Sequence, residues 1–218
     1  MELLEKSENK EKLRVLGQIA SSFRSFFRPL LIPKASLSKL LLGGTAFLEE
    51  QLSKTYRKKK FEKGLAFPLC LSLNAQAGYF LPGKEEDVLL KEGDLVKVEY
   101  ALQLDNFPLK VGDTYYLSPL DQETPDPIKR LLNALTEAQA IVPVLFNLKH
   151  STKEIISALE KIASKYGLSL VSGSPSYSHV PGMVSYQMSP GVIDGKNEDE
   201  DGDEIHRFIL QSMQIGRA

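Results

Sequence analysis

The chain has 218 residues, of which 42% are hydrophobic and 25% charged, values typical of a globular protein with one core. No window offers the roughly 18 uncharged apolar residues of a membrane-spanning helix, and the charged N-terminus predicts no secretory signal. The net charge of -1 conceals an asymmetry: residues 1–63 hold 14 Lys and Arg against 7 Asp and Glu, so this third of the chain suggests a surface for a polyanion.

The first 63 residues predict two helices. Apolar side chains recur at helical spacing over the first 30 residues or so, and Pro29 ends this pattern. A second helix is expected to begin after Ser36, a residue type that caps helix N-termini, and to run towards the basic cluster Arg57–Lys60. Gly43 and Gly44 inside it argue against a straight, continuous helix.

Strands are expected next. Leu69–Leu73 is a short, buried-looking run that contains Cys70, the single cysteine, which we interpret as a small core residue. From Val96 to Asp105 apolar and other residues alternate, the pattern of a half-buried strand. Asp105-Asn106 suits a tight turn into a second strand over 107–116, so a hairpin is predicted.

The last third predicts two helices followed by irregular chain. Pro127 sits at a first helical position, and Pro143 is expected to end that helix. Ser151–Glu154 forms a capping box that opens a further helix, which Gly167 ends. A loop over 172–181, an acidic tract over 198–204 and a last strand-like piece follow; the tract reads as a solvated loop.

Three short motifs occur in order between residues 63 and 97. Lys63–Pro68 reads K-G-L-A-F-P, Ser72–Asn74 reads S-L-N, and Leu90–Lys97 reads L-K-E-G-D-L-V-K. Together they resemble the type 2 methionine aminopeptidases. The chain is more similar still to the non-catalytic relatives of that enzyme, the proliferation-associated protein family.

The resemblance implies an α/β (α+β) pita-bread fold, in which two related halves surround one curved sheet. It continues over residues 128–140 and returns at 182–195, and the fold is expected to be truncated in its C-terminal half. We predict a single peptidase-like domain over 1–218. Its parts are basic N-terminal helices at 1–63, strands and a hairpin at 64–118, and helices with a partial second half at 119–218.

The metal ligands that the resemblance implies are replaced. The aminopeptidases hold two metal ions with two aspartates, one histidine and two glutamates, and a further histidine assists catalysis. Tyr79 stands at the catalytic histidine position, Glu99 and Lys110 at the two aspartate positions, and Tyr186 at the metal histidine position. One carboxylate cannot hold a hard divalent ion, and an ammonium repels it. We therefore predict no metal, no cofactor and no enzymatic activity, with Glu99 and Lys110 either in contact across the hairpin or solvated.

The densest positive cluster lies between residues 54 and 63. This cluster can be a solvated helix end without a binding role, or a site that contacts phosphate oxygens independently of base sequence. The resemblance favours the binding site, because the non-catalytic relatives bind ribosomal RNA and rim proteins beside the tunnel exit. The predicted RNA-binding residues are Lys54, Arg57, Lys58, Lys59, Lys60 and Lys63.

The leading hypothesis is a non-enzymatic, ribosome-associated pseudoenzyme that binds the large subunit near the polypeptide tunnel exit, without a membrane or small-molecule partner. A peptide- or protein-binding module that uses the degenerate cleft is the alternative, and a residual metallopeptidase comes last. A lone cysteine favours a reducing compartment, so the cytoplasm is expected, with the nucleus as a second location.

Overall fold

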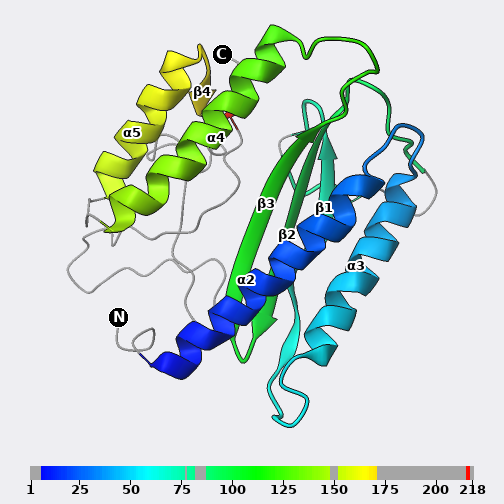
Figure 1. Cartoon of the computed structure of the whole chain (residues 1–218), viewed down its shortest axis with the longest axis vertical. Helices are drawn as coiled ribbons and strands as arrows, with labels where there is room; N and C mark the ends of the chain where they lie inside the picture. Colours follow the sequence, from blue (N-terminus) through cyan, green and yellow to red (C-terminus); the bar gives the residue numbers. More distant parts are fainter. Residues whose placement is uncertain (1–5, 77, 82–86, 148–151, 171–214, 217–218) are drawn as a thin grey trace. The chain divides into compact units, whose positions relative to one another are not determined.

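The computed structural model describes residues 6–76, 78–81, 87–147, 152–170 and 215–216. These residues form two compact units, with unit 1 running up to Leu120 and unit 2 beginning at Asp121. Unit 1 combines helices with a sheet, and so does unit 2 on a smaller scale (Figure 1). The predicted mixture of α and β structure is therefore confirmed, while the single domain over 1–218 stays a prediction.

The two predicted N-terminal helices are present. Helix α2 spans Ser7–Phe27, a 3-10 turn, η1, covers Arg28–Leu30, and helix α3 spans Leu37–Lys54. Ser36 caps α3 as predicted: its Oγ accepts a hydrogen bond from the backbone N–H of Lys39 at 3.1 Å.

Helix α3 passes through its two glycines without a break, contrary to the expectation drawn from Gly43 and Gly44. The two positions differ in their surroundings. A Cβ on Gly43 would meet nothing within 4 Å, whereas a Cβ on Gly44 would lie 2.6 Å from a methyl of Leu69 and 2.8 Å from the ring of Phe27. Gly44 therefore lets α3 approach the sheet and α2 closely, which explains its presence inside a helix.

The sheet of unit 1 has three antiparallel strands in the order β1-β2-β3: β1 covers Lys63–Leu73, β2 Leu95–Leu104 and β3 Phe107–Tyr116. The predicted hairpin is confirmed, because Asp105 and Asn106 connect β2 to β3 with φ angles of 52° and 63°, both in the left-handed region that such turns require. Strand β1 begins six residues before the predicted run, since its first part pairs with the end of β2.

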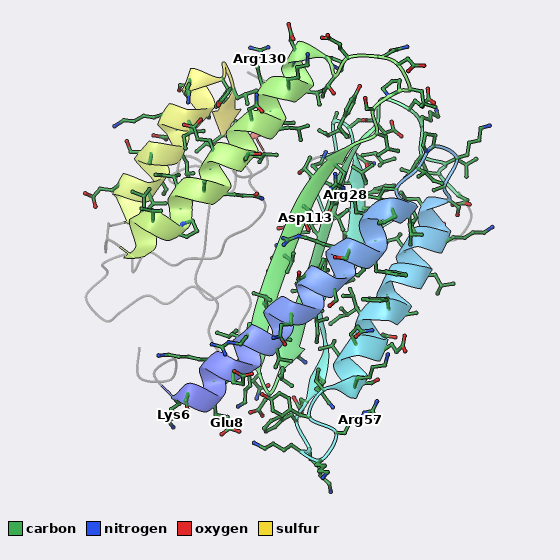
Figure 2. All side chains as sticks on the ribbon, in the orientation of Figure 1. Lys6, Glu8, Arg28, Arg57, Asp113 and Arg130 are labelled. Atoms are coloured by element: carbon green, nitrogen blue, oxygen red, sulfur yellow. The ribbon has the colours of Figure 1, made fainter. Side chains whose placement is uncertain are left out.

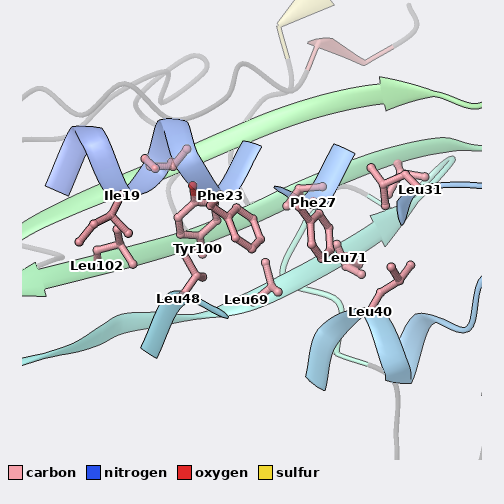
Figure 3. Packing of buried hydrophobic residues seen from close by; sticks show 14 of the residues in the cluster. Ile19, Phe23, Phe27, Leu31, Leu40, Leu48, Leu69, Leu71, Tyr100 and Leu102 are labelled. Atoms are coloured by element: carbon pink, nitrogen blue, oxygen red, sulfur yellow. The ribbon is translucent and has the colours of Figure 1, made fainter. Parts of the chain in front are cut away.

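Helices α2 and α3 cover one face of this sheet, and the core lies between them (Figure 1). Figure 3 shows its centre, where Phe23 and Phe27 of α2 meet Tyr100 of β2 and Leu69 and Leu71 of β1. The Phe23 ring stacks on Phe27 at 4.7 Å between centroids and meets the Tyr100 ring edge-on at 4.8 Å.

Strand β2 is buried on both faces, so the prediction of a half-buried strand was wrong. Val96, Val98 and Tyr100 face the helices, and by the two-residue period of a strand Lys97 and Glu99 point to the opposite face. Their exposed fractions are nevertheless only 8% and 2%. The alternation in the sequence is an alternation of polarity, which predicts a solvated face, whereas the polar side chains of β2 are buried.

Unit 2 contains helices α4 (Asp126–Asn147) and α5 (Thr152–Lys165) and a short antiparallel pair, β4 (Ser169–Leu170) with β5 (Ile215–Gly216). The prediction that Pro143 ends α4 was wrong, because the helix continues to Asn147. Proline removes one intrahelical bond, to the carbonyl of Gln139. Pro143 and Gln139 are both exposed, so water can hydrate that carbonyl.

Helix α5 ends where Gly167 predicts. Gly167 has a φ of +64°, and the N–H of Leu168 returns to the carbonyl of Ala163 at 2.9 Å, the bond pattern of a glycine-terminated helix. None of the helices in the described ranges is long and apolar enough to cross a membrane. The predicted loop at 172–181, the segment with Tyr186 and the acidic tract at 198–204 lie outside the described residues.

Candidate functional site

Three of the four degenerate positions come together beside the sheet face opposite α2 and α3. Glu99 of β2 pairs with Cys70 of β1 on one side and with Gly112 of β3 on the other. Lys110 pairs with Ala101, two residues along β2, so its side chain rises from the same face as that of Glu99. Glu99 and Lys110 are 2% and 7% exposed. We use the name degenerate cleft for Phe67, Cys70, Tyr79, Glu99 and Lys110, after the substrate cleft that the family resemblance implies.

Tyr79 joins the two charged residues. Its backbone N–H donates to Oε2 of Glu99 at 3.2 Å, and its hydroxyl accepts a hydrogen bond from Nζ of Lys110, also at 3.2 Å. The hydrogen bonds of the described residues therefore connect Glu99 and Lys110 through Tyr79, and the predicted direct contact is not among them. The tyrosine backbone has a φ of 59°, a conformation that its contact with Glu99 helps to hold.

Aromatic rings surround the Lys110 ammonium. Its Nζ lies 4.9 Å from the centroid of the Tyr79 ring and 5.2 Å from that of Phe67, and the two rings meet edge-on at 5.3 Å. Both distances are within the range of cation–π attraction. The Tyr79 side chain remains accessible, with 56% of the residue exposed. Phe67, a residue that sequence reasoning did not single out, belongs to the K-G-L-A-F-P motif.

The donor set of this cleft does not fit a metal. Burial, with a further contribution from Glu99, raises the pKa of the Cys70 thiol to about 11, so it is a neutral thiol at pH 7. Glu99 is the single carboxylate and Lys110 contributes a cation. Across the described residues no group of three or more His, Cys, Asp or Glu side chains could hold a metal ion. Hard divalent ions require several such ligands at once.

The other two motifs, S-L-N and L-K-E-G-D-L-V-K, are joined by a set of hydrogen bonds that we call the turn lock. Asn74 has a φ of 50°; its Nδ2 donates to Oδ1 of Asp94 at 2.9 Å, and its Oδ1 accepts from the N–H of Leu95 at 2.9 Å. Oδ2 of Asp94 accepts from the N–H of Lys91 at 2.8 Å. Nζ of Lys97 donates to the carbonyl of Asn74 at 2.6 Å. These residues fix where β1 ends and β2 begins.

The predicted RNA-binding cluster lies at the end of unit 1 that holds the start of α2 (Figure 2). Residues 55–62, which we call the basic loop, connect α3 to β1. Three of the six predicted cations make contacts within the chain. Lys54 pairs with Glu50 at 2.6 Å, Lys59 pairs with Glu8 of α2 at 2.7 Å, and Lys63 donates to the carbonyl of Thr55 at 2.7 Å.

The remaining three cations, Arg57, Lys58 and Lys60, are exposed and have no ion pair or hydrogen bond among the contacts of the described residues. Such cations present their charge to an approaching polyanion, since no carboxylate in the described part of the chain pairs with them. Among the described contacts, the cluster therefore divides into cations that are bonded within the chain and exposed cations that are not. Spacing alone does not reveal this division, because Glu8 lies 51 residues from Lys59.

The fold is that of the methionine aminopeptidases, the pita-bread fold. An Arx1 structure from a thermophile matches with a TM-score of 0.69 at 22% identity, over 88% of this chain and 56% of that one. The methionine aminopeptidase of Thermotoga maritima matches with a TM-score of 0.64 at 16% identity, over 95% of this chain and 77% of that one. At these identities the likeness concerns the fold alone.

Three curated relatives are similar to most of this chain. ERBB-3 binding protein 1 of Arabidopsis thaliana is 32% identical over 75% of this chain and 39% of its own. The curved DNA-binding protein of Schizosaccharomyces pombe is 29% identical over 97% and 55%. Proliferation-associated protein A of Dictyostelium discoideum is 27% identical over 79% and 44%. The predicted resemblance is confirmed: members of the proliferation-associated protein family are homologues of this chain.

The chain spans about half or less of the length of these relatives. No protein-family model matches it.

Proposed function

We propose that this protein is a non-catalytic factor that binds the large ribosomal subunit near the polypeptide tunnel exit, through ribosomal RNA and neighbouring ribosomal proteins. The observation that carries the proposal is the basic loop, which presents Arg57, Lys58 and Lys60 to solvent without a carboxylate partner among the described contacts. A relative named as a DNA-binding protein is consistent with a polyanionic ligand. The cytoplasm, where translation takes place, is the proposed location, with the nucleus as a second one.

A phosphate backbone suits this loop for an electrostatic reason. Each Lys or Arg that meets a phosphate displaces a condensed counterion, so the affinity falls steeply with salt and depends little on base sequence. Three such cations, Arg57, Lys58 and Lys60, stand within four consecutive residues of the sequence. Their number sets the expected salt dependence, since each phosphate contact contributes about 0.7 to 0.9 to the slope of log K against log salt.

Loss of aminopeptidase chemistry is the second part of the proposal. The cleft holds a carboxylate, a neutral thiol and a lysine beside two aromatic rings, which is not a set that activates water through a metal. We propose that the scaffold is retained for its surface rather than for catalysis. Elemental analysis that finds one or more equivalents of tightly bound metal per chain would contradict this.

Co-sedimentation with purified large ribosomal subunits through a sucrose cushion at near-physiological salt tests the binding. We expect the wild type to co-sediment and the triple variant R57Q/K58Q/K60Q to remain in the supernatant. The matched control is R28Q/K39Q/K91Q, which also removes one Arg and two Lys that are exposed in unit 1. Figure 2 places Arg28 at the other end of α2 from Arg57. Equal loss in both variants would indicate attraction by net charge and not a basic-loop site.

The degenerate cleft supports a second candidate, a peptide-binding module, because Tyr79 is half exposed above Lys110 and Glu99. Peptide binding there would be insensitive to salt and would be lost on Tyr79→Ala or Tyr186→Ala. Ribosome binding through the basic loop has the opposite signature. A salt-independent association that survives the basic-loop variant and fails in the tyrosine variants would select the peptide function.

A further inference from the structure

We propose that Lys12 and Glu8 of α2 are positioning residues that hold the basic loop in its binding shape, and that Lys59 serves the same role instead of contacting the polyanion. The inference rests on the proposed function, because it assigns separate tasks to the cations of one binding surface. It concerns residues that lie far from the loop in the sequence and that the basic cluster alone does not identify.

Lys12 is a buried cation at the base of the loop. It is 5% exposed, pairs with the carboxylate of Asp105 and donates to Oδ1 of Asn9 at 3.2 Å. Its Nζ lies 4.9 Å from the centroid of the Phe61 ring and 5.2 Å from that of Phe107. Lys12 therefore contacts the basic loop through Phe61 and the β2–β3 hairpin through Asp105 and Phe107.

The hairpin is itself attached to the loop. The backbone N–H of Asp105 donates to the carbonyl of Glu62, the last residue of the loop, at 2.7 Å. A single ammonium thus connects three segments: α2, the basic loop and the turn between β2 and β3. Removing its charge leaves the Asp105 carboxylate without this ion pair, the Phe107 ring without the cation it faces, and the Phe61 ring with one cation in place of two.

The ring of Phe61 faces both the buried ammonium of Lys12 and the exposed ammonium of Lys59. Nζ of Lys59 lies 5.1 Å from the centroid of Phe61 and 5.8 Å from that of Tyr56, and Tyr56 and Phe61 meet edge-on at 5.3 Å. The same ammonium pairs with Glu8 at 2.7 Å. Phe61 therefore has one ammonium from inside the protein and another from the surface, and both loop aromatics are engaged with cations of the chain.

Lys12, Glu8 and Lys59 affect binding by ordering the basic loop and not by contacting the polyanion. A flexible loop must be immobilised when it binds, at a cost of about 0.5–1.5 kcal/mol for each ordered side chain, whereas a loop already held in shape avoids much of that cost. Lys12 is buried, so it displaces no counterion from a phosphate. Its loss should weaken binding while leaving the number of phosphate contacts unchanged.

The experiment compares Lys12→Met with the wild type by amide hydrogen exchange of the free protein and by binding to purified large subunits over a series of salt concentrations. We expect exchange to rise over residues 55–62 but not within α3. The dissociation constant should rise on the order of three- to tenfold, from ordering one or two side chains. The salt slope should stay at the wild-type value, whereas R57Q/K58Q/K60Q should lower it by about 2 to 3.

Two further variants guard against a general loss of stability. Asp105→Asn removes the charge of the Lys12 partner at a side chain that is 36% exposed, in a turn conformation that asparagine tolerates, and should reproduce the effect in milder form. Lys97→Met removes a different buried lysine, which bonds to Asn74, and should leave exchange in the basic loop unchanged.

Unchanged exchange of residues 55–62 in both Lys12→Met and Asp105→Asn would overturn the inference, and so would a salt slope that falls as far as in the triple variant. Failure of the wild type to bind the subunits would overturn the proposed function and with it the task assigned to Lys12. The exchange of the free protein distinguishes the two failures, because it measures the anchor without any ligand.

Discussion

Replacing Gly44 by alanine tests the closest approach in the core of unit 1. The added Cβ would lie 2.6 Å from Cδ2 of Leu69 and 2.8 Å from Cε2 of Phe27. Both residues are almost fully buried, at 2% and 1% exposed, so neither can move aside into solvent. Overpacking of a closed core costs about 1–3 kcal/mol of the free energy of unfolding, against which alanine gains about 1 kcal/mol of helix propensity.

Gly43→Ala is the matched control, because it lies in the same helix and its Cβ would meet nothing within 4 Å. It should stabilise the protein by about 0.5–1 kcal/mol through helix propensity alone. Since both variants gain propensity, their difference isolates the packing cost. We expect Gly44→Ala to be less stable than Gly43→Ala by about 1–3 kcal/mol in urea unfolding followed by circular dichroism.

A double-mutant cycle with Leu69→Ala makes the test sharper. Leu69→Ala alone leaves a cavity and should cost about 2–5 kcal/mol. In the double variant the methyl group that Gly44→Ala adds enters that cavity, so the two changes should cost less together than the sum of the single changes. Equal stability of Gly44→Ala and Gly43→Ala, or additive costs in the cycle, would refute the close approach of α3 to β1.

Two further predictions concern the cleft and its turn lock. Asn74→Ala should lower the free energy of unfolding, measured by urea titration, by about 2–4 kcal/mol, because it removes two side-chain hydrogen bonds and places alanine at a φ of 50°. The control is Asn106→Ala, at a residue with a φ of 63° and no such bonds among the described contacts. It should cost only about 1–2 kcal/mol in the same titration. Equal losses would show that conformation alone accounts for the effect. Cys70 should resist alkylation by iodoacetamide at pH 8.5 in the native protein, since burial raises its pKa to about 11 and it is 1% exposed, and should react rapidly in urea. Rapid labelling of the native protein, detected by mass spectrometry, would contradict the burial of Cys70 beside Glu99.

Local signals predicted the elements that local chemistry determines. Ser36 caps α3 and Gly167 ends α5 through bonds between residues a few positions apart, and Asp105-Asn106 turns the hairpin through left-handed φ angles. Two of the predictions that failed depend on distant residues. Gly44 is tolerated because of Leu69 and Phe27, and Lys97 and Glu99 are buried although the alternation pattern assigns them to a solvated face.

The same distinction applies to the candidate sites. The prediction that the metal ligands are replaced came from residue types, whereas the link from Glu99 through Tyr79 to Lys110 depends on a positive-φ tyrosine that spacing does not reveal. The basic cluster was readable as charge. Its division, among the described contacts, into cations bonded within the chain and cations without such bonds depends in part on Glu8, which the fold brings to Lys59 from α2.

The motifs that identified the family have structural tasks in this chain. Asn74 and Asp94 lock the end of β1 to the start of β2, and Phe67 packs its ring against Tyr79 beside Lys110. None of these roles requires a metal or a substrate. The sequence signature can therefore be kept for structural reasons alone, because its residues stabilise the turns and strands. In this protein, recognition of the motifs predicts the fold, whereas the proposals about function rest on the residues of the degenerate cleft and on the basic loop.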